Sequence, residues 1–213
     1  MTTEGDREMS ETGHSASRVL LMGPPGAGKG TQAVQLARML GVPAISTGEL
    51  FRAEVREGTD LGRQVSHLLA EGGYVPDELT NALVAHRLDR PDAERGFLLD
   101  GYPRTVAQVH ELDDMLARRE HRLDAALALV VDAEVLVARL DGRAAQGRAD
   151  DRPEVIRERI ARYESETAHL TALYEERGIL FHVDGTGQPG EVTDRLTRAL
   201  RQNGRPPRPT DGE

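Results

Sequence analysis

Short apolar runs that alternate with longer segments of helical spacing make up most of the chain. The apolar runs occupy residues 18–22, 42–45, 96–99, 126–131 and 179–183, and each has the length of a strand buried on both faces. Apolar residues at helical spacing predict helices over 31–40, 48–57, 61–70, 77–88, 106–118, 134–140, 153–177 and 191–201. This alternation predicts an α/β fold, in which helices flank both faces of a five-stranded parallel sheet and ligands bind at the carboxyl ends of the strands.

The ends of the chain and two internal segments do not follow this alternation. Residues 1–17 and 203–213 are polar and charged, a composition that predicts disordered tails on a single domain spanning 18–202. Residues 46–75 are mostly helical and lie between the second and third predicted strands, and a segment rich in glycine and arginine covers about 141–152. We expect these two segments to form small mobile lobes.

Composition excludes several classes of protein. Hydrophobic residues make up 38% of the 213 residues, and no apolar run approaches the roughly 20 residues of a membrane-spanning helix. The chain has no cysteine, which excludes disulfides, thiolate catalysis and cysteine-ligated zinc, and its seven histidines lack metal-ligand spacing. Because the residues before Arg18 lack the apolar stretch of a secretion signal, we expect a soluble, cytoplasmic protein without zinc or a membrane partner.

The charges are distributed unevenly among the residue types. The formal net charge is -9, which disfavours nucleic acid and anionic membranes as partners of the whole surface but allows a local basic site. Of the 27 basic residues, 26 are arginine, and Lys29 is the only lysine. Lys29 either stands where a slender ammonium group is required or is the one lysine left by chance. Composition does not decide between these two explanations.

A glycine-rich segment connects the first predicted strand to the first predicted helix. From residue 23 it reads GPPGAGKGT. Such a turn directs backbone N–H groups and the positive end of a helix dipole towards phosphate, and Lys29 can reach the outer phosphate groups. A flexible Gly/Pro turn is the alternative, but it would not require lysine at this position. The segment predicts a phosphate-binding loop (P-loop), whose candidate ATP contacts are Gly26, Ala27, Gly28, Lys29, Gly30 and Thr31.

Gly30 separates Lys29 from the hydroxyl group of Thr31, and this variant of the P-loop resembles that of nucleoside monophosphate kinases. Four later segments match motifs of this family in the same order. Residues 45–52 resemble STGELLR, 74–78 resemble LVPDE, 96–105 resemble FLLDGFPRT and precede Gln108, and 147–151 resemble GRxDD. Over about residues 18 to 200 the chain is similar to adenylate kinases of the short-lid type. The resemblance implies a P-loop NTPase-type fold, a monomer, and the reaction MgATP + AMP ⇌ 2 ADP.

The resemblance also implies how the acceptor would be bound. The residues implied to contact AMP are Thr47, Arg52, Val75, Gly101, Arg104, Gln108, Arg148 and Arg159. Arg52 and Arg104 would hold the phosphate of AMP, and Pro103 resembles the cis-proline that aims Arg104 into the site. Thr47 and Gln108 stand where pyrimidine kinases of the family have Ala and Asn. Since a glutamine amide offers both a donor and an acceptor to an adenine edge, both residues favour AMP.

A second group of residues is implied to act on ATP and on the transferred phosphoryl group. They are Lys29, Arg104, Arg139, Arg143, Arg148 and Arg159. Arg139 would stack on the adenine of ATP, although it could equally be an exposed helix arginine. Arg143 would hold the phosphates of ATP from a short lid, where the acidic Asp141 departs from the family pattern.

Asp100 ends an apolar strand and is the candidate for magnesium, reached through the water shell of the ion. A cap or salt-bridge partner for a neighbouring loop is the alternative for this carboxylate. Magnesium, as MgATP, is the only cofactor that the resemblance implies.

Two other functions compete with this reading. A UMP/CMP kinase or a broader monophosphate kinase would share the same loops, and only Thr47 and Gln108 argue against it. A P-loop module that binds nucleotide without transferring phosphate would not need a second set of phosphate arginines. The presence of such a set therefore favours an enzyme.

Overall fold

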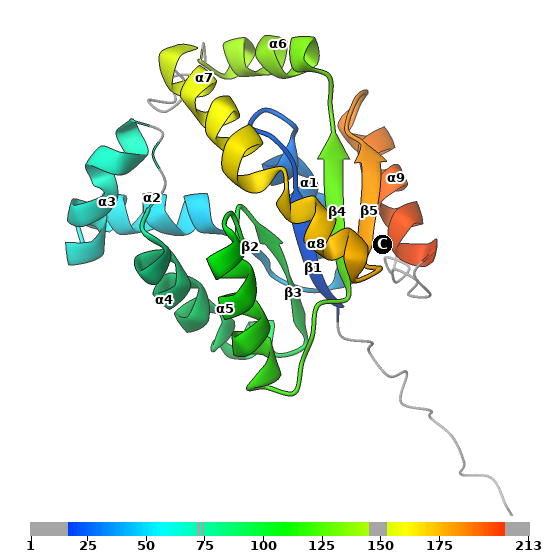
Figure 1. Cartoon of the computed structure of the whole chain (residues 1–213), viewed down its shortest axis with the longest axis horizontal. Helices are drawn as coiled ribbons and strands as arrows, with labels where there is room; N and C mark the ends of the chain where they lie inside the picture. Colours follow the sequence, from blue (N-terminus) through cyan, green and yellow to red (C-terminus); the bar gives the residue numbers. More distant parts are fainter. Residues whose placement is uncertain (1–16, 72, 74, 145–152, 203–213) are drawn as a thin grey trace, which may run out of the picture.

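Five parallel strands form the sheet of the computed structural model, which describes residues 17–71, 73, 75–144 and 153–202 (Figure 1). The strands are β1 (Ser17–Met22), β2 (Ala44–Ser46), β3 (Gly96–Asp100), β4 (Ala125–Val130) and β5 (Leu180–Asp184). Their order is β2-β3-β1-β4-β5, and every pair of neighbours is parallel. The predicted fold class is confirmed. Strand β2 begins only after Pro43, which has no N–H to donate to a neighbouring strand.

Helices cover both faces of this sheet. Helices α5 and α8 lie over one face, and α1 and α9 lie over the other (Figure 1). The helices are α1 (Lys29–Leu40), α2 (Thr47–Glu57), α3 (Asp60–Ala70), α4 (Asp77–Leu88), α5 (Val106–Ala117), α6 (Ala133–Ala144), α7 (Pro153–Arg162), α8 (Leu170–Glu176) and α9 (Pro189–Gln202), with a short 3₁₀ turn η1 (Pro91–Ala93) and a π-helix η3 (Tyr163–Thr167). None of the helices that the structure describes has the length and apolar character needed to cross a bilayer.

The core has two layers because successive side chains of a strand point to opposite faces of the sheet. In β1, Leu20 belongs to the layer under α5 and α8, whereas its neighbours Val19 and Leu21 belong to the layer under α1 and α9. All three side chains are at most 2% exposed. The near-continuous apolar runs of the sequence therefore correspond to strands covered on both faces.

Helices α2 and α3 project from the sheet and have a small core of their own (Figure 1). Phe51, Val65 and Val75 form this core. The two helices approach each other closely at Gly62, where an added Cβ would lie 2.1 Å from the carbonyl oxygen of Glu54. Any larger residue at this position would force the helices apart.

The predicted continuous helix over 153–177 is wrong. The chain forms α7, then the π-helix η3, and then α8. Hydroxyl groups in and after the break bond to backbone carbonyl oxygens, from Ser165 to Arg162 at 3.2 Å and from Thr171 to Ala168 at 2.7 Å. Such side-chain bonds compete with regular helix geometry. In addition, the hydroxyl of Thr167 donates to the distant carbonyl oxygen of Arg104 at 3.2 Å.

Two buried tyrosines differ in how their hydroxyl groups are satisfied. The side chain of Tyr174 is fully buried, and its hydroxyl has no hydrogen-bond partner within the described part of the chain. The hydroxyl of Tyr102 lies 2.8 Å from Asn81 Oδ1 and 3.3 Å from the carbonyl oxygen of Gln108. Burial raises the pKa of both phenols above the ordinary range. The hydroxyl of Tyr174 therefore loses its hydration on folding without gaining a bond.

We expect Tyr174→Phe to raise the free energy of unfolding by about 1 kcal/mol, because it removes a buried polar group that lacks a partner. Tyr102→Phe is the matched control and should lower the free energy of unfolding by about 1 kcal/mol, because its hydroxyl is bonded. Chemical denaturation of the three proteins measures both changes. A Tyr174→Phe protein less stable than wild type would contradict this interpretation.

Candidate active site

The P-loop lies between the end of β1 and the first turn of α1, as predicted. Gly26 and Gly28 have φ angles of 85° and 93°, which other residues adopt only at a cost. An added Cβ on Gly26 would also lie 2.9 Å from Cγ of Leu140. Helix α1 begins without a side-chain cap, so its first N–H groups remain available to an anion. The Nζ of Lys29 donates to the carbonyl oxygens of Gly23 at 2.7 Å and Pro24 at 3.0 Å, which holds the ammonium group over the loop.

The carboxyl ends of β1, β2 and β3 lie side by side. In the register of the sheet, Asp100 is the partner of Leu21 in β1 and of Ser46 in β2. Its side chain is therefore one strand away from the P-loop, and the residue is 8% exposed. Thr47 follows β2 directly, and its hydroxyl donates to the carbonyl oxygen of Gly101 at 2.9 Å. This bond links the start of α2 to the turn after β3.

Arg104 is held in this turn by bonds to both its backbone and its side chain. Its Nε donates to the carbonyl oxygen of Gly101 at 2.8 Å, and its backbone N–H donates to Oε1 of Gln108 at 2.8 Å. The Tyr102–Pro103 peptide bond is cis, as the resemblance implied. Because the carbonyl oxygen of Gly101 accepts from both Arg104 and Thr47, Arg104 lies next to the start of α2.

Arg52 reaches the same region from α2. Its guanidinium forms an ion pair with Glu49 at 2.6 Å, one turn earlier in the helix. It also folds over Gly48, where an added Cβ would lie 3.2 Å from Nη2. Since Gly48 is next to Thr47, and Thr47 is bonded to the turn that carries Arg104, the two predicted phosphate arginines approach one another from α2 and from the β3–α5 turn.

Gln108 is buried in the first turn of α5, with 3% of its surface exposed. Its Nε2 donates to Oδ1 of Asp77 at 2.6 Å, and Oδ2 of Asp77 accepts a bond from the Thr105 hydroxyl, also at 2.6 Å. Asp77 is the first residue of α4, and the sequence predicted no role for its side chain. Asp77 is also the first residue of the helix predicted over 77–88, and it belongs to the segment 74–78 that resembles LVPDE.

The guanidinium of Arg139 donates to two backbone carbonyl oxygens. Its Nη1 donates to the carbonyl oxygen of Ala27 in the P-loop at 3.3 Å, and its Nη2 donates to that of Gly185 after β5 at 2.9 Å. Arg139 is therefore a half-buried residue that joins α6 to the P-loop, and the reading as an exposed helix arginine is wrong.

The described residues include only part of the predicted lid. Helix α6 continues to Ala144, and so contains Arg143, while Arg148 and residues 145–152 lie outside the described residues. Arg159 lies on α7, which passes with α6 over the carboxyl ends of the strands (Figure 1). The predicted tails, apart from Ser17, also lie outside the described residues.

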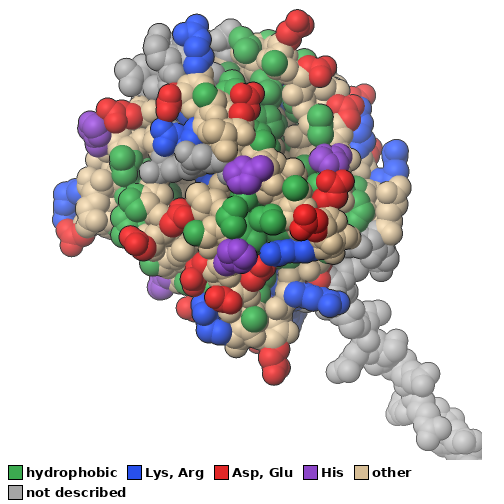
Figure 2. All heavy atoms as spheres, in the orientation of Figure 1, with side chains coloured by type: hydrophobic (Ala, Val, Ile, Leu, Met, Phe, Trp, Pro, Cys, Tyr) green, Lys and Arg blue, Asp and Glu red, His purple; other side chains and the backbone are tan. Residues whose placement is uncertain are grey.

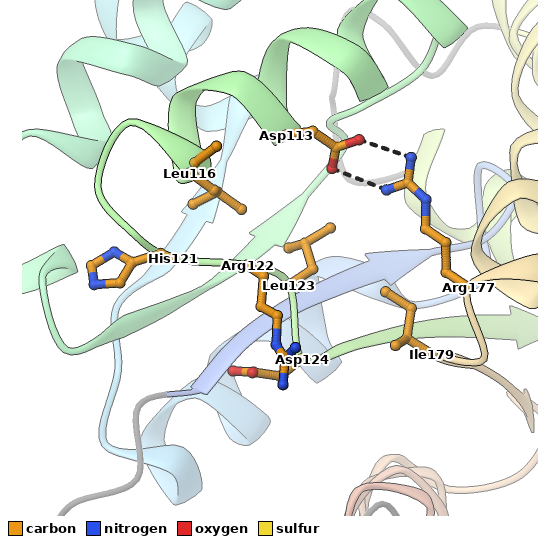
Figure 3. Close-up of a pocket in the computed structure, with 9 residues that line it drawn as sticks. Asp113, Leu116, His121, Arg122, Leu123, Asp124, Arg177 and Ile179 are labelled. Carbon is orange, nitrogen blue, oxygen red and sulfur yellow. Dashed lines mark hydrogen bonds and ion pairs between the residues drawn. The ribbon is translucent and has the colours of Figure 1, made fainter.

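A surface cavity of about 590 Å³ lies elsewhere in the molecule (Figure 3). It is lined by residues that precede β4 and β5, such as Leu123 and Ile179, and so lies near the amino ends of the strands. Two of its charged groups bond to each other, because Arg177 forms a bidentate ion pair with Asp113 at 3.0 and 2.8 Å. None of the predicted site residues lines this cavity.

Comparison with known proteins identifies the family to which this site belongs. Residues 21–179 match the family model described as adenylate kinase. The chain belongs to the adenylate kinase family. It is 54% identical over 184 residues to the adenylate kinase of a Nocardioides species, an alignment covering 86% of this chain and 96% of the relative. It is 51% identical over 196 residues to that of Leifsonia xyli, covering 92% and 98%.

The residues of this adenylate kinase fit a magnesium ion that is bound mainly by nucleotide and water. Within the described residues, no cluster of three or more His, Cys, Asp or Glu side chains could enclose a metal. The buried carboxylate of Asp100 lies one strand away from the P-loop. Magnesium commonly uses one or two carboxylates, several waters and substrate phosphates, and Asp100 suits that mode of binding.

We expect Gly101→Ala to lower kcat/KM for AMP by about tenfold or more. Gly101 has a φ of 82°, and an added Cβ would lie 2.9 Å from the Thr47 hydroxyl and 3.1 Å from Nη2 of Arg104. Alanine is strained at such a φ and would displace both side chains. Steady-state kinetics with varied AMP measures the loss.

Gly190→Ala is the matched control for this substitution. Gly190 lies in α9, and nothing lies within 4 Å of its added Cβ. This variant should keep the wild-type kcat/KM. Equal activity of the Gly101→Ala and Gly190→Ala proteins would show that the turn does not need glycine.

Proposed function

We propose that this adenylate kinase binds ATP on the P-loop, binds AMP between α2 and the β3–α5 turn, and transfers the γ-phosphoryl group between them. As a member of its family the chain is an ATP:AMP phosphotransferase. One observation supports the assignment of the two sites above all others. The P-loop follows β1, and the turn that carries Arg104 follows β3, its direct neighbour in the sheet. Two phosphate-binding segments at adjacent strand ends suit transfer better than simple binding.

Phosphoryl transfer needs positioning and charge neutralisation more than it needs a covalent nucleophile or a general base. We assign Lys29 and the backbone N–H groups of the P-loop to the β- and γ-phosphates of ATP. Arg52 and Arg104 take the phosphate of AMP, which requires Arg52 to exchange Glu49 for the phosphate group. Planar guanidinium groups suit such contacts because they bind two oxygens at once.

The remaining assignments concern the ATP base, the lid and the metal. Arg139 would stack on the adenine of ATP, and Arg143 would hold the phosphates of ATP. Arg148 and Arg159 would contact the transferred group when the lid segment 141–152 closes. Magnesium, when bound with ATP, would neutralise phosphate charge, with Asp100 holding its water shell. Closure of this segment and of the lobe formed by residues 46–75 would exclude water from the reacting groups.

We also propose that the protein acts as a monomer on ATP, AMP and ADP in the cytoplasm, without nucleic acid or membrane partners. Figure 2 supports the part concerning nucleic acid, because acidic and basic side chains are intermixed over the face that it shows. A continuous basic surface, which nucleic acid requires, is not present on that face. The net charge of -9 agrees with this interpretation.

We expect AMP to be used at least about 100-fold more efficiently than CMP, UMP or GMP, because a buried amide left unpaired by the wrong base costs binding energy. A coupled assay with saturating MgATP and each of the four monophosphates measures kcat/KM. Thr47→Ala combined with Gln108→Asn should narrow the preference for AMP over CMP and UMP. Wild-type preference for CMP or UMP would instead indicate a pyrimidine kinase.

We expect Lys29→Arg to lower kcat by about 100-fold or more, although the charge is kept. The ammonium of Lys29 fits between two carbonyl oxygens, where a broader guanidinium would be displaced from its position at the phosphates. Arg38→Lys makes the converse exchange at an exposed position of the same helix and should leave kcat unchanged. Near-normal turnover of Lys29→Arg would show that this position does not require lysine.

A further inference from the structure

The side-chain amide of Gln108 is held from both ends in the structure. The backbone N–H of Arg104 donates to Oε1 at 2.8 Å, and Nε2 donates to Oδ1 of Asp77 at 2.6 Å. A backbone N–H can only donate and a carboxylate can only accept. These two neighbours therefore permit one orientation of the amide, with its oxygen towards Arg104 and its nitrogen towards Asp77.

The carboxylate of Asp77 is itself held in place by a second donor. Its Oδ2 accepts a bond from the hydroxyl of Thr105 at 2.6 Å, and the same hydroxyl accepts a bond from the backbone N–H of Gln108 at 3.2 Å. Both oxygens of Asp77, at the start of α4, thus bond to groups at the start of α5. Because each oxygen has its own donor, Asp77 cannot turn to suit a rotated Gln108 without losing bonds.

This arrangement determines what the amide offers to a ligand. A primary amide has two N–H groups and two lone pairs on oxygen. Arg104 and Asp77 use one of each, so one donor and one acceptor remain. The polar edge of adenine has a donor at N6 beside an acceptor at N1, whereas a 6-oxopurine such as hypoxanthine has an acceptor at O6 beside a donor at N1. The two purines have nearly the same shape and opposite polarity along this edge.

We propose that Asp77 is a positioning residue that fixes the polarity of the Gln108 amide and so selects AMP over a 6-oxopurine monophosphate such as inosine monophosphate (IMP). This inference rests on the proposed role of Gln108 in reading the base of AMP. To bind hypoxanthine, the amide must rotate by half a turn. Its oxygen would then face the carboxylate of Asp77, and its NH₂ group would face the N–H of Arg104. Both contacts are repulsive, so the monophosphate with the opposite edge is rejected.

The test is Asp77→Asn, which keeps the shape of the side chain. An asparagine can rotate its own amide and donate to the oxygen of a rotated Gln108, which removes one of the two repulsive contacts. We expect the preference for AMP over IMP to narrow by about tenfold, the factor that corresponds to losing one bond to a charged group. The preference is measured as the ratio of kcat/KM values, or as Ki for IMP against KM for AMP. KM for ATP should not change.

Tyr102→Phe is the matched control, because the Tyr102 hydroxyl also connects α4 to α5 through Asn81 and the carbonyl oxygen of Gln108. This substitution perturbs the same contact between α4 and α5 but removes no bond of the Gln108 side-chain amide. The ratio of kcat/KM for AMP to kcat/KM for IMP should therefore stay at the wild-type value. Asp77→Ser is a second variant that removes the carboxylate and should narrow the ratio in the same direction. Thermal unfolding of each protein identifies the folded variants.

Gln108→Ala separates this inference from the proposed function. In that background, Asp77→Asn should have no further effect on the ratio, because the residue through which Asp77 acts is gone. A wild-type ratio of AMP to IMP efficiency in a folded Asp77 variant overturns the inference. Tyr102→Phe overturns it too if this variant narrows the ratio as much as the Asp77 variants do. In either case, a changed ratio in Gln108→Ala would leave the base-reading role of Gln108 intact. A wild-type ratio in Gln108→Ala itself would overturn both.

Discussion

The parallel pairing of β3 with β1 on one side and with β2 on the other is the constraint on which the active site depends. Asp100 is level with Leu21 and with Ser46, so the three strands end at the same height. The P-loop, the turn that carries Arg104 and the start of α2 must then emerge next to one another. Two nucleotides that exchange a phosphoryl group have to be held close together, and adjacent strand ends bring the two binding segments side by side.

Carbonyl oxygens hold several of the cations in this site. Lys29 bonds to Gly23 and Pro24, Arg104 bonds to Gly101, and Arg139 bonds to Ala27 and Gly185. Each of these contacts orients a cation through a dipole. A carboxylate in the same place would cancel the charge of the cation, whereas a carbonyl dipole does not. Where its backbone is suitably folded, an acidic protein can therefore orient cations towards polyanionic nucleotides.

Sequence reasoning succeeded where the decisive residues are close together in the chain. The strands and most helices follow from short-range periodicity, and the P-loop is nine consecutive residues beginning at Gly23. The prediction of a continuous helix over 153–177 was wrong at Tyr163–Thr167. The break in the helix involves a hydrogen bond from Thr167 to the carbonyl oxygen of Arg104, which is 63 positions away. The bond between Gln108 and Asp77 joins residues 31 positions apart, and no local pattern indicates it.

The selectivity of a glutamine that reads a base is not a property of the residue type. A free amide can rotate and match either polarity, so it can discriminate only as strongly as its neighbours resist that rotation. In this site, rotating Gln108 would sacrifice one bond to a carboxylate and one from a backbone N–H, together about 2 to 4.5 kcal/mol. That cost limits the discrimination between adenine and a 6-oxopurine through this residue to between roughly 30-fold and roughly 2,000-fold. With the role proposed for Gln108, the specificity of the acceptor site is bounded by the contacts between α4 and the start of α5, and not by the identity of residue 108 alone.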